Sequence, residues 1–148
     1  LTKSGLVVAL EKYTELLGTE WIRFTSNVDV ALPFDVSFAL FRTAQAALHN
    51  AVKHSGVGDR PNGLVDVSLR LKNGYIILRV ADNGRGFDLK ATKAAYPAPY
   101  GLERMKKLAA DLGEPLRIIT RPDRGTIVVA CTPLKEVLDA KQDKSFTC

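Results

Sequence analysis

The chain has little of several features that mark specialised classes of protein. Its 148 residues include only two cysteines, Cys131 and Cys148, which fit neither a disulfide framework nor the spacing of a zinc site. No apolar run approaches the roughly 20 residues that a membrane-spanning helix needs, so we expect no membrane contact by this part of the protein. The scarcity of cysteine favours a cytoplasmic location for this part of the protein. That location is compatible with a parent protein that is anchored in a membrane.

Aromatic residues are also scarce, at 7% of the chain, and the basic residues behind its net charge of +5 are scattered. Nucleic-acid-binding surfaces combine clustered basic residues with stacking aromatics, so we expect no direct nucleic-acid binding. The positive charge is compatible with a smaller anionic partner such as a nucleotide. The first residues lack the features of a signal peptide, and we expect the chain to be a segment of a longer protein.

Hydrophobic periodicity predicts three main helices. The first covers residues 6–17, and the second runs from Pro33 to Gly56 with an apolar face that includes Phe38 and Phe41. The third covers residues 101–113 and ends at a glycine. The proline-containing stretch 90–100 has no clear periodicity, which predicts a loop or lid.

Alternating apolar and polar residues predict the strands. One short strand lies within residues 19–28, and a hairpin covers residues 64–82 around the favoured turn Asn73-Gly74. A last pair of strands flanks the turn 122–125. Because most strands are adjacent in sequence, we expect an α+β, two-layer α/β sandwich with a mixed, mostly antiparallel sheet of about five strands, covered on one face by three helices.

Polar side chains gather on one side of the second helix. Ala46, Asn50, Lys53 and His54 follow one another at steps of four, three and one, so they share a face beside the apolar stripe. An amide oxygen of the kind that magnesium accepts, an ammonium and an imidazole together can meet a phosphate. The alternative is an ordinary solvated face.

The stretch "RVADNGRGFD" places Asp82 at the end of a predicted strand and follows it with Gly84 and Gly86. These glycines leave no side chain to obstruct a flat ligand, and the carboxylate is placed to accept a hydrogen bond from an exocyclic amine. Taken alone, the pattern is more typical of a turn or a bulge than of a ligand site.

The order AALHNAVKHS, DNGRGF, YGLERM, DRGTIVV is more specific than any one of these parts. It resembles the ATP-binding catalytic domain of two-component sensor histidine kinases, which has the Bergerat (GHKL) fold shared with gyrase-like and mismatch-repair ATPases. The stretch LFRTAQAALHNAVKHS is most similar to the subfamily with a Gln-Glu-Ala-Leu-Asn-Asn-type N box. The resemblance implies a domain over residues 1–134, with a leading helix at 1–18, an ATP lid at 87–100 and a charged, frayed tail at 135–148.

The resemblance also implies a role for each matching residue. Asn50 would be the Mg²⁺ ligand, with Lys53 and His54 near the phosphates of ATP, and Asp82 would accept the adenine amine. The remaining implied nucleotide-binding residues are Gly84 and Gly86 at the adenine pocket, Gly101 and Leu102 at the hinge of the lid, and Gly125 and Thr126 beside adenine.

Three positions depart from the family pattern. Ala46 stands where the subfamily has a glutamate, the general base for water in the hydrolysing relatives, so we expect inefficient ATP hydrolysis. His49 stands where asparagine is common, and contact with phosphate and simple solvation are equally supported. Pro99 replaces the first glycine of the lid, which predicts a stiffer lid.

The resemblance implies transfer of the γ-phosphoryl group of ATP to a histidine on a separate, upstream dimerisation domain of a homodimeric parent, and a response regulator as partner. The chain's only histidines are His49 and His54, on the presumed nucleotide helix, so no catalytic residue is assigned within it. Two alternatives remain: a degenerate nucleotide-binding or scaffolding module, indicated by Ala46 and Pro99, and a serine kinase of the anti-sigma-factor type.

Overall fold

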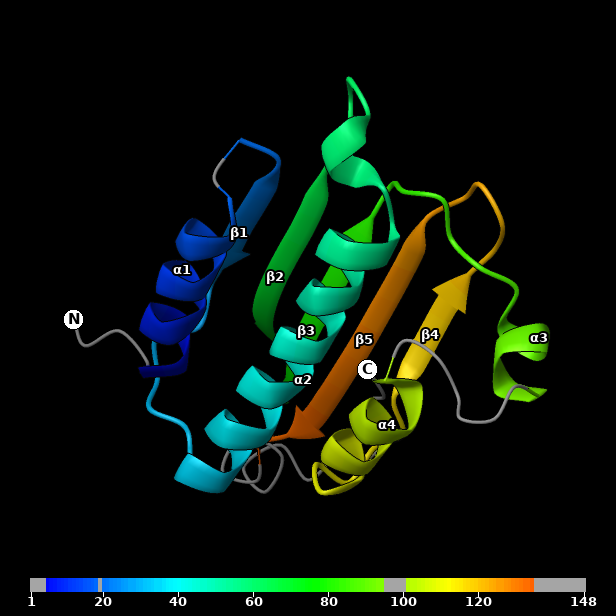
Figure 1. Cartoon of the computed structure of the whole chain (residues 1–148). Coiled ribbons are helices and arrows are strands. Elements are labelled where there is room, and N and C mark those ends of the chain that lie inside the picture. Colours follow the sequence, from blue (N-terminus) through cyan, green and yellow to red (C-terminus); the bar gives the residue numbers. More distant parts are fainter. Residues whose placement is uncertain (1–4, 19, 95–100, 135–148) are drawn as a thin grey trace.

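A computed structural model describes residues 5–18, 20–94 and 101–134 of the chain (Figure 1). Helices and strands follow one another in the predicted order of helix, strand, helix, hairpin, lid segment, helix and hairpin. The elements are α1 (Gly5–Leu17), β1 (Ile22–Ser26), α2 (Phe34–His54), the 3-10 turn η1 (Val57–Asp59), β2 (Val65–Lys72), β3 (Tyr75–Asp82), α3 (Leu89–Ala94), α4 (Leu102–Ala110), β4 (Arg117–Thr120) and β5 (Thr126–Pro133).

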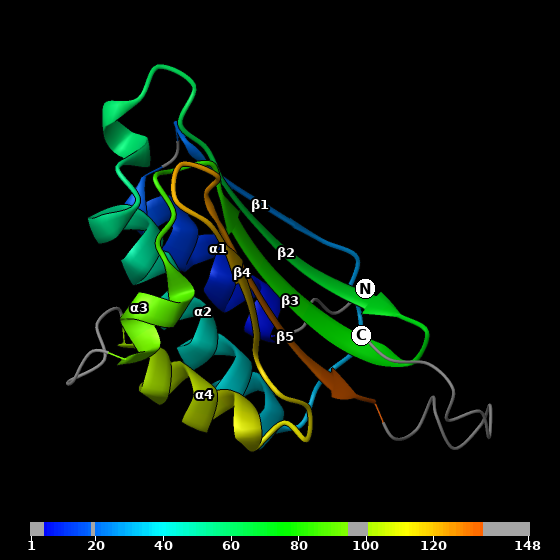
Figure 2. The ribbon, with the colours of Figure 1, turned by 90° about the vertical axis from the view of Figure 1, so that its right-hand side faces the viewer.

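The five strands form one mixed sheet in the order β1-β2-β3-β5-β4. β1 pairs with β2 in parallel, and the other three pairings are antiparallel. Helices α1, α2 and α4 lie on the same face of this sheet, as the side view shows (Figure 2). The predicted two-layer α+β sandwich is therefore confirmed.

The long helix α2 lies across the middle of the sheet and contributes most to the core. Its fully buried positions include Leu40, Ala44 and Leu48, which pack with strand residues such as Leu69 and Ile76. The prediction that Phe38 belongs to this face was wrong, because Phe38 lies in the second turn of α2 with 53% of its surface exposed. It stacks there on Phe34, which is even more exposed, with ring centroids 6.0 Å apart.

The stretch predicted as a loop or lid begins with a short helix, α3. Asp88 caps it, because its carboxylate accepts hydrogen bonds from the backbone N–H groups of Lys90 at 3.0 Å and Ala91 at 3.2 Å. Thr92 adds a side-chain hydrogen bond back to the Asp88 carbonyl. The rest of the predicted lid, including Pro99, lies outside the described residues.

The predicted turn of the β2-β3 hairpin is confirmed. Asn73 and Gly74 both have positive φ angles, of 53° and 81°, which matches the right-handed twist of the flanking strands. The eight-residue pairing that follows places Asp82 opposite Val65, at the far end of the hairpin. Within the described part of the chain, no helix is long and apolar enough to cross a membrane.

Candidate functional site

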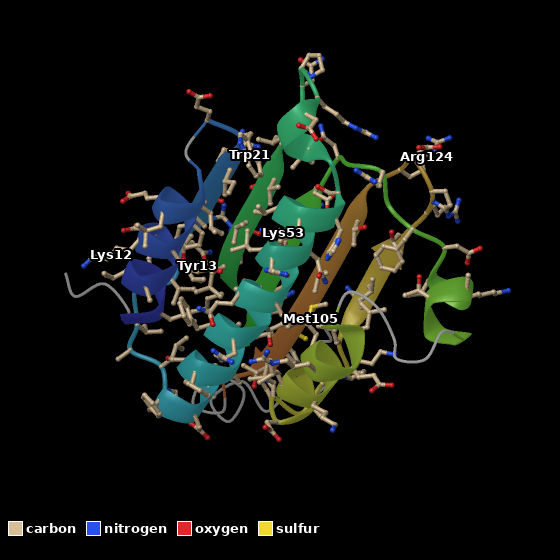
Figure 3. All side chains as sticks on the ribbon, viewed as in Figure 1. Lys12, Tyr13, Trp21, Lys53, Met105 and Arg124 are labelled. Atoms are coloured by element: carbon tan, nitrogen blue, oxygen red, sulfur yellow. The ribbon has the colours of Figure 1, made fainter. Side chains whose placement is uncertain are left out.

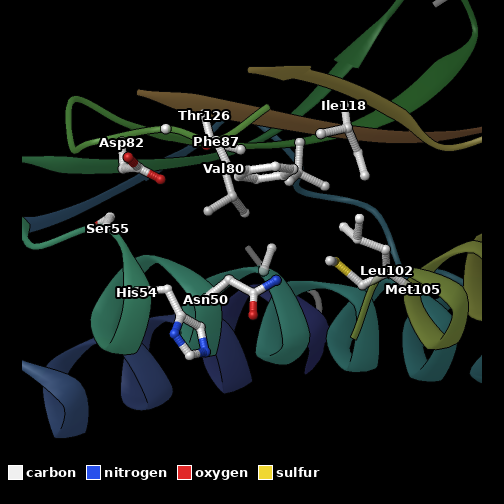
Figure 4. A pocket seen from close by; sticks show the side chains of 13 residues that line it. Asn50, His54, Ser55, Val80, Asp82, Phe87, Leu102, Met105, Ile118 and Thr126 are labelled. Carbon is white, nitrogen blue, oxygen red and sulfur yellow. The ribbon is translucent and has the colours of Figure 1, made fainter. Parts of the chain in front are cut away.

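An apolar pocket lies between the sheet and the helices α2 and α4; we call it the inner pocket (Figure 4). Five polar residues line it: Asn50 and His54 from α2, Ser55 directly after α2, Asp82 from the end of β3, and Thr126 from the start of β5. The rest of its lining is mainly apolar and includes Val80, Phe87, Leu102, Met105, Ile118 and Val128. A flat, largely apolar group with one hydrogen-bond donor fits such a lining.

Asp82 holds a fixed position at the wall of the inner pocket. Its side chain accepts a hydrogen bond from the backbone N–H of Gly84 at 2.9 Å and another from the backbone N–H of Thr126. Burial raises the pKa of this carboxyl above its ordinary value, and the two backbone hydrogen bonds and Arg60 partly oppose the shift. The side chain points into the space between sheet and helix, where a ligand amine can meet it (Figure 4).

Three glycines allow the segments around Asp82 to pack backbone against backbone. A Cβ on Gly84 would lie 2.4 Å from the Ser55 carbonyl oxygen, and one on Gly86 would lie 1.9 Å from that of Arg121. A Cβ on Gly125 would lie 2.1 Å from the carbonyl oxygen of Asp82 itself. Gly84 and Gly86 therefore admit neighbouring protein backbone, and Gly86 also lines the inner pocket.

Hydroxyl groups connect the two strands next to Asp82. The Thr120 and Thr126 hydroxyl oxygens lie 2.8 Å apart, and Thr120 also accepts a hydrogen bond from the backbone N–H of Phe87 at 3.1 Å. The Thr120 hydroxyl lies 3.2 Å from the Gly125 carbonyl oxygen as well. Thr126 is thus oriented by Thr120, a residue that the sequence analysis did not identify.

Asn83 fixes the opposite side of the same loop. Its side chain accepts a hydrogen bond from Leu64 N–H at 2.8 Å and donates one to the Asn62 carbonyl at 2.7 Å. The guanidinium of Arg60 donates to the Asn83 carbonyl at 3.0 Å. These contacts attach the loop after β3 to the segment that precedes β2, so Asp82 is held from both sides.

A second pocket, the outer pocket, adjoins the inner one. The two share Asn50 and His54, which therefore stand at their junction. The lining of the outer pocket is polar and includes Arg42, Gln45 and His49 from α2, and Gly101 and Arg104 at the start of α4. Among the described residues that line it there is no carboxylate, which favours an anionic occupant.

Positive charge around this junction affects His54. Desolvation lowers the pKa of its imidazole, and the nearby His49, Arg85 and Lys53 lower it further. The rings of His49 and His54 lie 6.2 Å apart in an edge arrangement. Both imidazoles therefore stand at the cationic side of the site, where they can donate or accept hydrogen bonds.

The structure brings together most of the residues predicted for the site. Asn50, His54, Asp82, Gly86, Leu102 and Thr126 line the inner pocket, and Gly101 joins Asn50 and His54 in the outer one. Gly84 and Gly125 lie directly behind Asp82. Lys53 lines neither pocket; it lies one turn beyond Asn50 on α2 with an exposed side chain (Figure 3). Arg42 and Arg104, which were not predicted, also line the outer pocket.

The site is better suited to a metal ion that binds together with a ligand molecule than to one held by protein side chains alone. Within the described ranges, no group of three or more His, Cys, Asp or Glu side chains is placed to hold a metal. The oxygen of Asn50, at the junction of the two pockets, is an acceptable ligand for Mg²⁺, which usually keeps waters and phosphate oxygens as its other ligands. The chemistry of the donors therefore fits Mg²⁺ bound together with a polyphosphate.

Comparison with known proteins agrees with this geometry. The chain is 34% identical over 109 residues to the sensor protein VraS of Staphylococcus aureus (strain COL), a match that covers 73% of the chain and 29% of that protein. It is 32% identical over 116 residues to VraS of Staphylococcus epidermidis (strain ATCC 12228 / FDA PCI 1200), covering 78% of the chain and 31% of that protein. The chain thus spans less than a third of the length of these relatives.

Solved structures share the fold. The histidine kinase domain of the blue-light activated histidine kinase from Erythrobacter litoralis superimposes with a TM-score of 0.71 at 23% identity, over 93% of this chain and 65% of that one. Residues 35–136 match the family described as "Histidine kinase-, DNA gyrase B-, and HSP90-like ATPase". The chain therefore belongs to this ATPase family, as an ATP-binding domain of the sensor histidine kinase type.

Proposed function

We propose that this domain binds Mg²⁺-ATP and transfers its γ-phosphoryl group to a histidine on a separate, upstream dimerisation domain of the parent protein. The observation that carries the proposal is the pair of adjoining pockets that meet at Asn50. The inner pocket is apolar with one fixed carboxylate, and the outer pocket is cationic. This division matches the apolar base and the anionic phosphates of a nucleotide.

Recognition of the base falls to Asp82. Its carboxylate, held by the N–H groups of Gly84 and Thr126, accepts a hydrogen bond from the exocyclic amine of adenine. The Thr126 hydroxyl lies beside it on the neighbouring strand. Phe87 and Met105 contribute apolar surface to the pocket that receives the ring. Gly84, Gly86 and Gly125 keep this wall in shape, as their backbone contacts indicate.

Binding of the phosphates falls to α2 and the start of α4. Asn50 holds Mg²⁺, which neutralises charge on the phosphates when it is bound. His54 stands beside Asn50 at the junction. Lys53, exposed on the next turn of α2 and outside both pockets, would contact the phosphates through its long side chain. Gly101 and Leu102 form the hinge between the lid and α4, and Gly101 has a positive φ of 62°. Positioning and charge neutralisation are the main contributions that such a transfer needs.

Ala46 should affect hydrolysis of ATP more than transfer of its γ-phosphoryl group to a histidine. It lines the outer pocket where a carboxylate would be needed to activate water, and none lines that pocket within the described residues. The domain therefore hydrolyses ATP inefficiently by itself. Transfer to a histidine does not require this base, because the acceptor and its surroundings belong to another domain.

The assignment extends to the subfamily and the partners. We assign the chain to the kinases with the Gln-Glu-Ala-Leu-Asn-Asn-type N box, with a catalytic domain over residues 1–134, a lid over 87–100 and a tail from residue 135. His49 and His54 both belong to the nucleotide site, so the acceptor histidine lies elsewhere in a homodimeric parent. The phosphoryl group then passes to a response regulator. The domain works in the cytoplasm without contacting membrane or nucleic acid itself.

A degenerate nucleotide-binding module is the second candidate, and Ala46 is the observation that favours it. Such a module would bind Mg²⁺-ATP through the same pockets without transferring a phosphoryl group. Its binding properties would match those of an active domain, so only a transfer assay separates the two.

Two measurements test the proposal. Calorimetry on the 148-residue chain should show Mg²⁺-dependent ATP binding that Asn50→Ala weakens strongly, while Asn62→Ala, at an exposed position outside both pockets, leaves it intact. Radiolabelled ATP should then label the parent protein, with its upstream helical region, on histidine. Absence of binding contradicts both candidates. Binding without labelling, unrepaired by Ala46→Glu, favours the degenerate module.

A further inference from the structure

We propose that Arg42 and Arg104 bind the terminal phosphate of ATP from two sides and thereby make this domain prefer ATP to ADP. We call this pair the arginine clamp. The inference rests on the proposed function, because it assumes that a nucleotide occupies the two pockets. It adds two residues, from different helices, that neither the motif pattern nor the resemblance assigns.

The two guanidinium groups converge on one cavity. Arg42 lies on α2 two turns before Asn50, with Ala46 between them on the same face, and all three line the outer pocket. Arg104 lies in the first turn of α4 and lines the same pocket. Because α2 and α4 pack directly against each other, the cavity between them has a cation on each wall.

Neither arginine has an acidic partner among the residues that the structure describes. In the part of the chain that the structure describes, the one ion pair joins Arg23 to Asp66, far from this pocket. Arg42 instead donates a weak hydrogen bond of 3.3 Å to the neutral side chain of Gln45. Two guanidinium groups that face one cavity without a carboxylate repel each other, and an anion between them relieves that repulsion.

Ala46 is part of this arrangement. A carboxylate at this position would stand one helical turn from Arg42 and attract its guanidinium, as pairs four residues apart do on a helix. Alanine leaves Arg42 available for a ligand and leaves space between Arg42 and Asn50. Alanine at position 46 therefore removes a general base for hydrolysis and also leaves Arg42 available to bind phosphate.

The order of the pockets decides which phosphate the clamp meets. With the base against Asp82, a nucleotide passes the junction at Asn50 and His54 before it reaches the outer pocket. Arg42 and Arg104 line only the outer pocket, so they stand beyond this junction. The terminal phosphate of ATP extends farther than that of ADP, and its oxygens suit the bidentate donors of arginine.

The test compares the affinities of the 148-residue chain for ATP and ADP, each with Mg²⁺, by calorimetry. Hydrogen bonds to charged groups predict that Arg42→Gln and Arg104→Gln each weaken ATP binding about tenfold and ADP binding by less than about threefold. Arg→Lys at either position should weaken ATP binding less than Arg→Gln, because lysine keeps the positive charge but lacks the paired donors of the guanidinium group. Lys107→Gln is the matched control, since Lys107 lies exposed on α4 outside the pocket.

The clamp is wrong if both glutamine variants leave the ratio of ATP affinity to ADP affinity unchanged. This outcome includes the case in which they weaken binding of the two nucleotides equally. If the unmodified chain binds neither nucleotide, the proposed function fails as well. If it binds both and only the ratio fails to respond, the clamp alone is wrong. Both side chains lie outside the buried core, so the variants should keep the thermal unfolding of the parent chain, which verifies that affinity and not folding has changed.

Discussion

The two ends of the candidate site are built in different ways. The base end consists of backbone and short side chains: two N–H groups hold Asp82, and three glycines bring strand ends and loops into contact. The phosphate end consists of long side chains on two helices, among which Arg42 makes only one weak described hydrogen bond. The base end is thus held in place by the protein itself, whereas we expect the charge of a bound ligand to order the phosphate end.

This difference predicts that substitutions at the two ends impair different properties of the domain. A change at the base end should cost folding stability or overall nucleotide affinity, because its groups support both the sheet and the ligand. A change at the phosphate end should alter discrimination between nucleotides and leave the fold intact. The four predictions below test this contrast, beginning with the largest expected effect.

Gly125→Ala should destabilise the domain by at least about 2 kcal/mol, or prevent folding. The residue has a φ of 76°, which costs alanine about 1–2 kcal/mol, and the new Cβ would lie 2.1 Å from the Asp82 carbonyl oxygen. Urea unfolding measures the change. Gly113→Ala is the matched control, because φ is 89° there and nothing lies within 4 Å of the new Cβ. Equal losses at the two positions would show that the backbone contact contributes nothing.

Asp82→Asn should weaken ATP and ADP binding equally, by about tenfold to a hundredfold. One side-chain oxygen already accepts the Gly84 N–H, so the amide would present an NH₂ donor to the donor amine of adenine. Calorimetry with both nucleotides measures the loss, and the exposed Asp29→Asn is the control. Unchanged ATP affinity would falsify the adenine role of Asp82. A loss confined to ATP would remove the contrast between the two ends.

Ala46→Glu should reduce ATP affinity about threefold and ADP affinity less, while stability stays the same. The new carboxylate would repel the terminal phosphate and attract Arg42 in a pocket whose described lining has no other acid. Ala46→Gln has nearly the same size without the charge and should leave ATP binding close to that of the parent chain. If both variants weaken binding alike, then steric crowding at position 46 matters and charge does not.

The smallest predicted effect is a pH dependence of stability at the base end. Burial raises the pKa of Asp82 above its ordinary value of 3.8, so the folded state binds the proton more readily than the unfolded state. This contribution to stability is present below the ordinary pKa and is lost as the pH rises through the raised pKa. Asp82→Asn removes it, so the variant should gain stability relative to the parent chain as the pH rises from 3.8. Urea unfolding at several pH values, with Asp29→Asn as the baseline, should show this sign; the opposite slope would contradict it.

Local sequence rules predicted most of the fold. Pro33 at the start of α2, the alternation around Asn73-Gly74 and the order of elements were sufficient for the mixed five-strand sheet with helices on one face. The capped helix α3 was missed because the signal was a single residue, Asp88, before six residues without periodicity. Phe38 was assigned to the apolar face of α2 because periodicity alone does not show which apolar positions of a helix other elements cover.

The site was predicted only in part, because sequence patterns identify residues of local motifs but not contacts between distant segments. Asn50 and Asp82 each belong to a short motif with its own chemistry, and the structure places both at one pocket. Arg42 shares the α2 face of Ala46 and Asn50, so helical spacing could have included it. Arg104 could not be found this way, because its position near Arg42 depends on how α4 packs against α2. The tight backbone contacts of Gly84 and Gly86 likewise depend on Ser55 and Arg121, which lie far away in sequence.

The Asn73-Gly74 turn has a practical consequence for studying this protein. It lies at the opposite end of β3 from Asp82, and eight residues at about 3.3 Å each separate the two by roughly 25 Å. Asn73 is exposed, so a fluorophore or an affinity tag attached at this turn would be distant from Asp82 and the base end of the site. The turn is therefore a suitable attachment point for immobilised or single-molecule nucleotide-binding assays in which the site itself must remain unmodified.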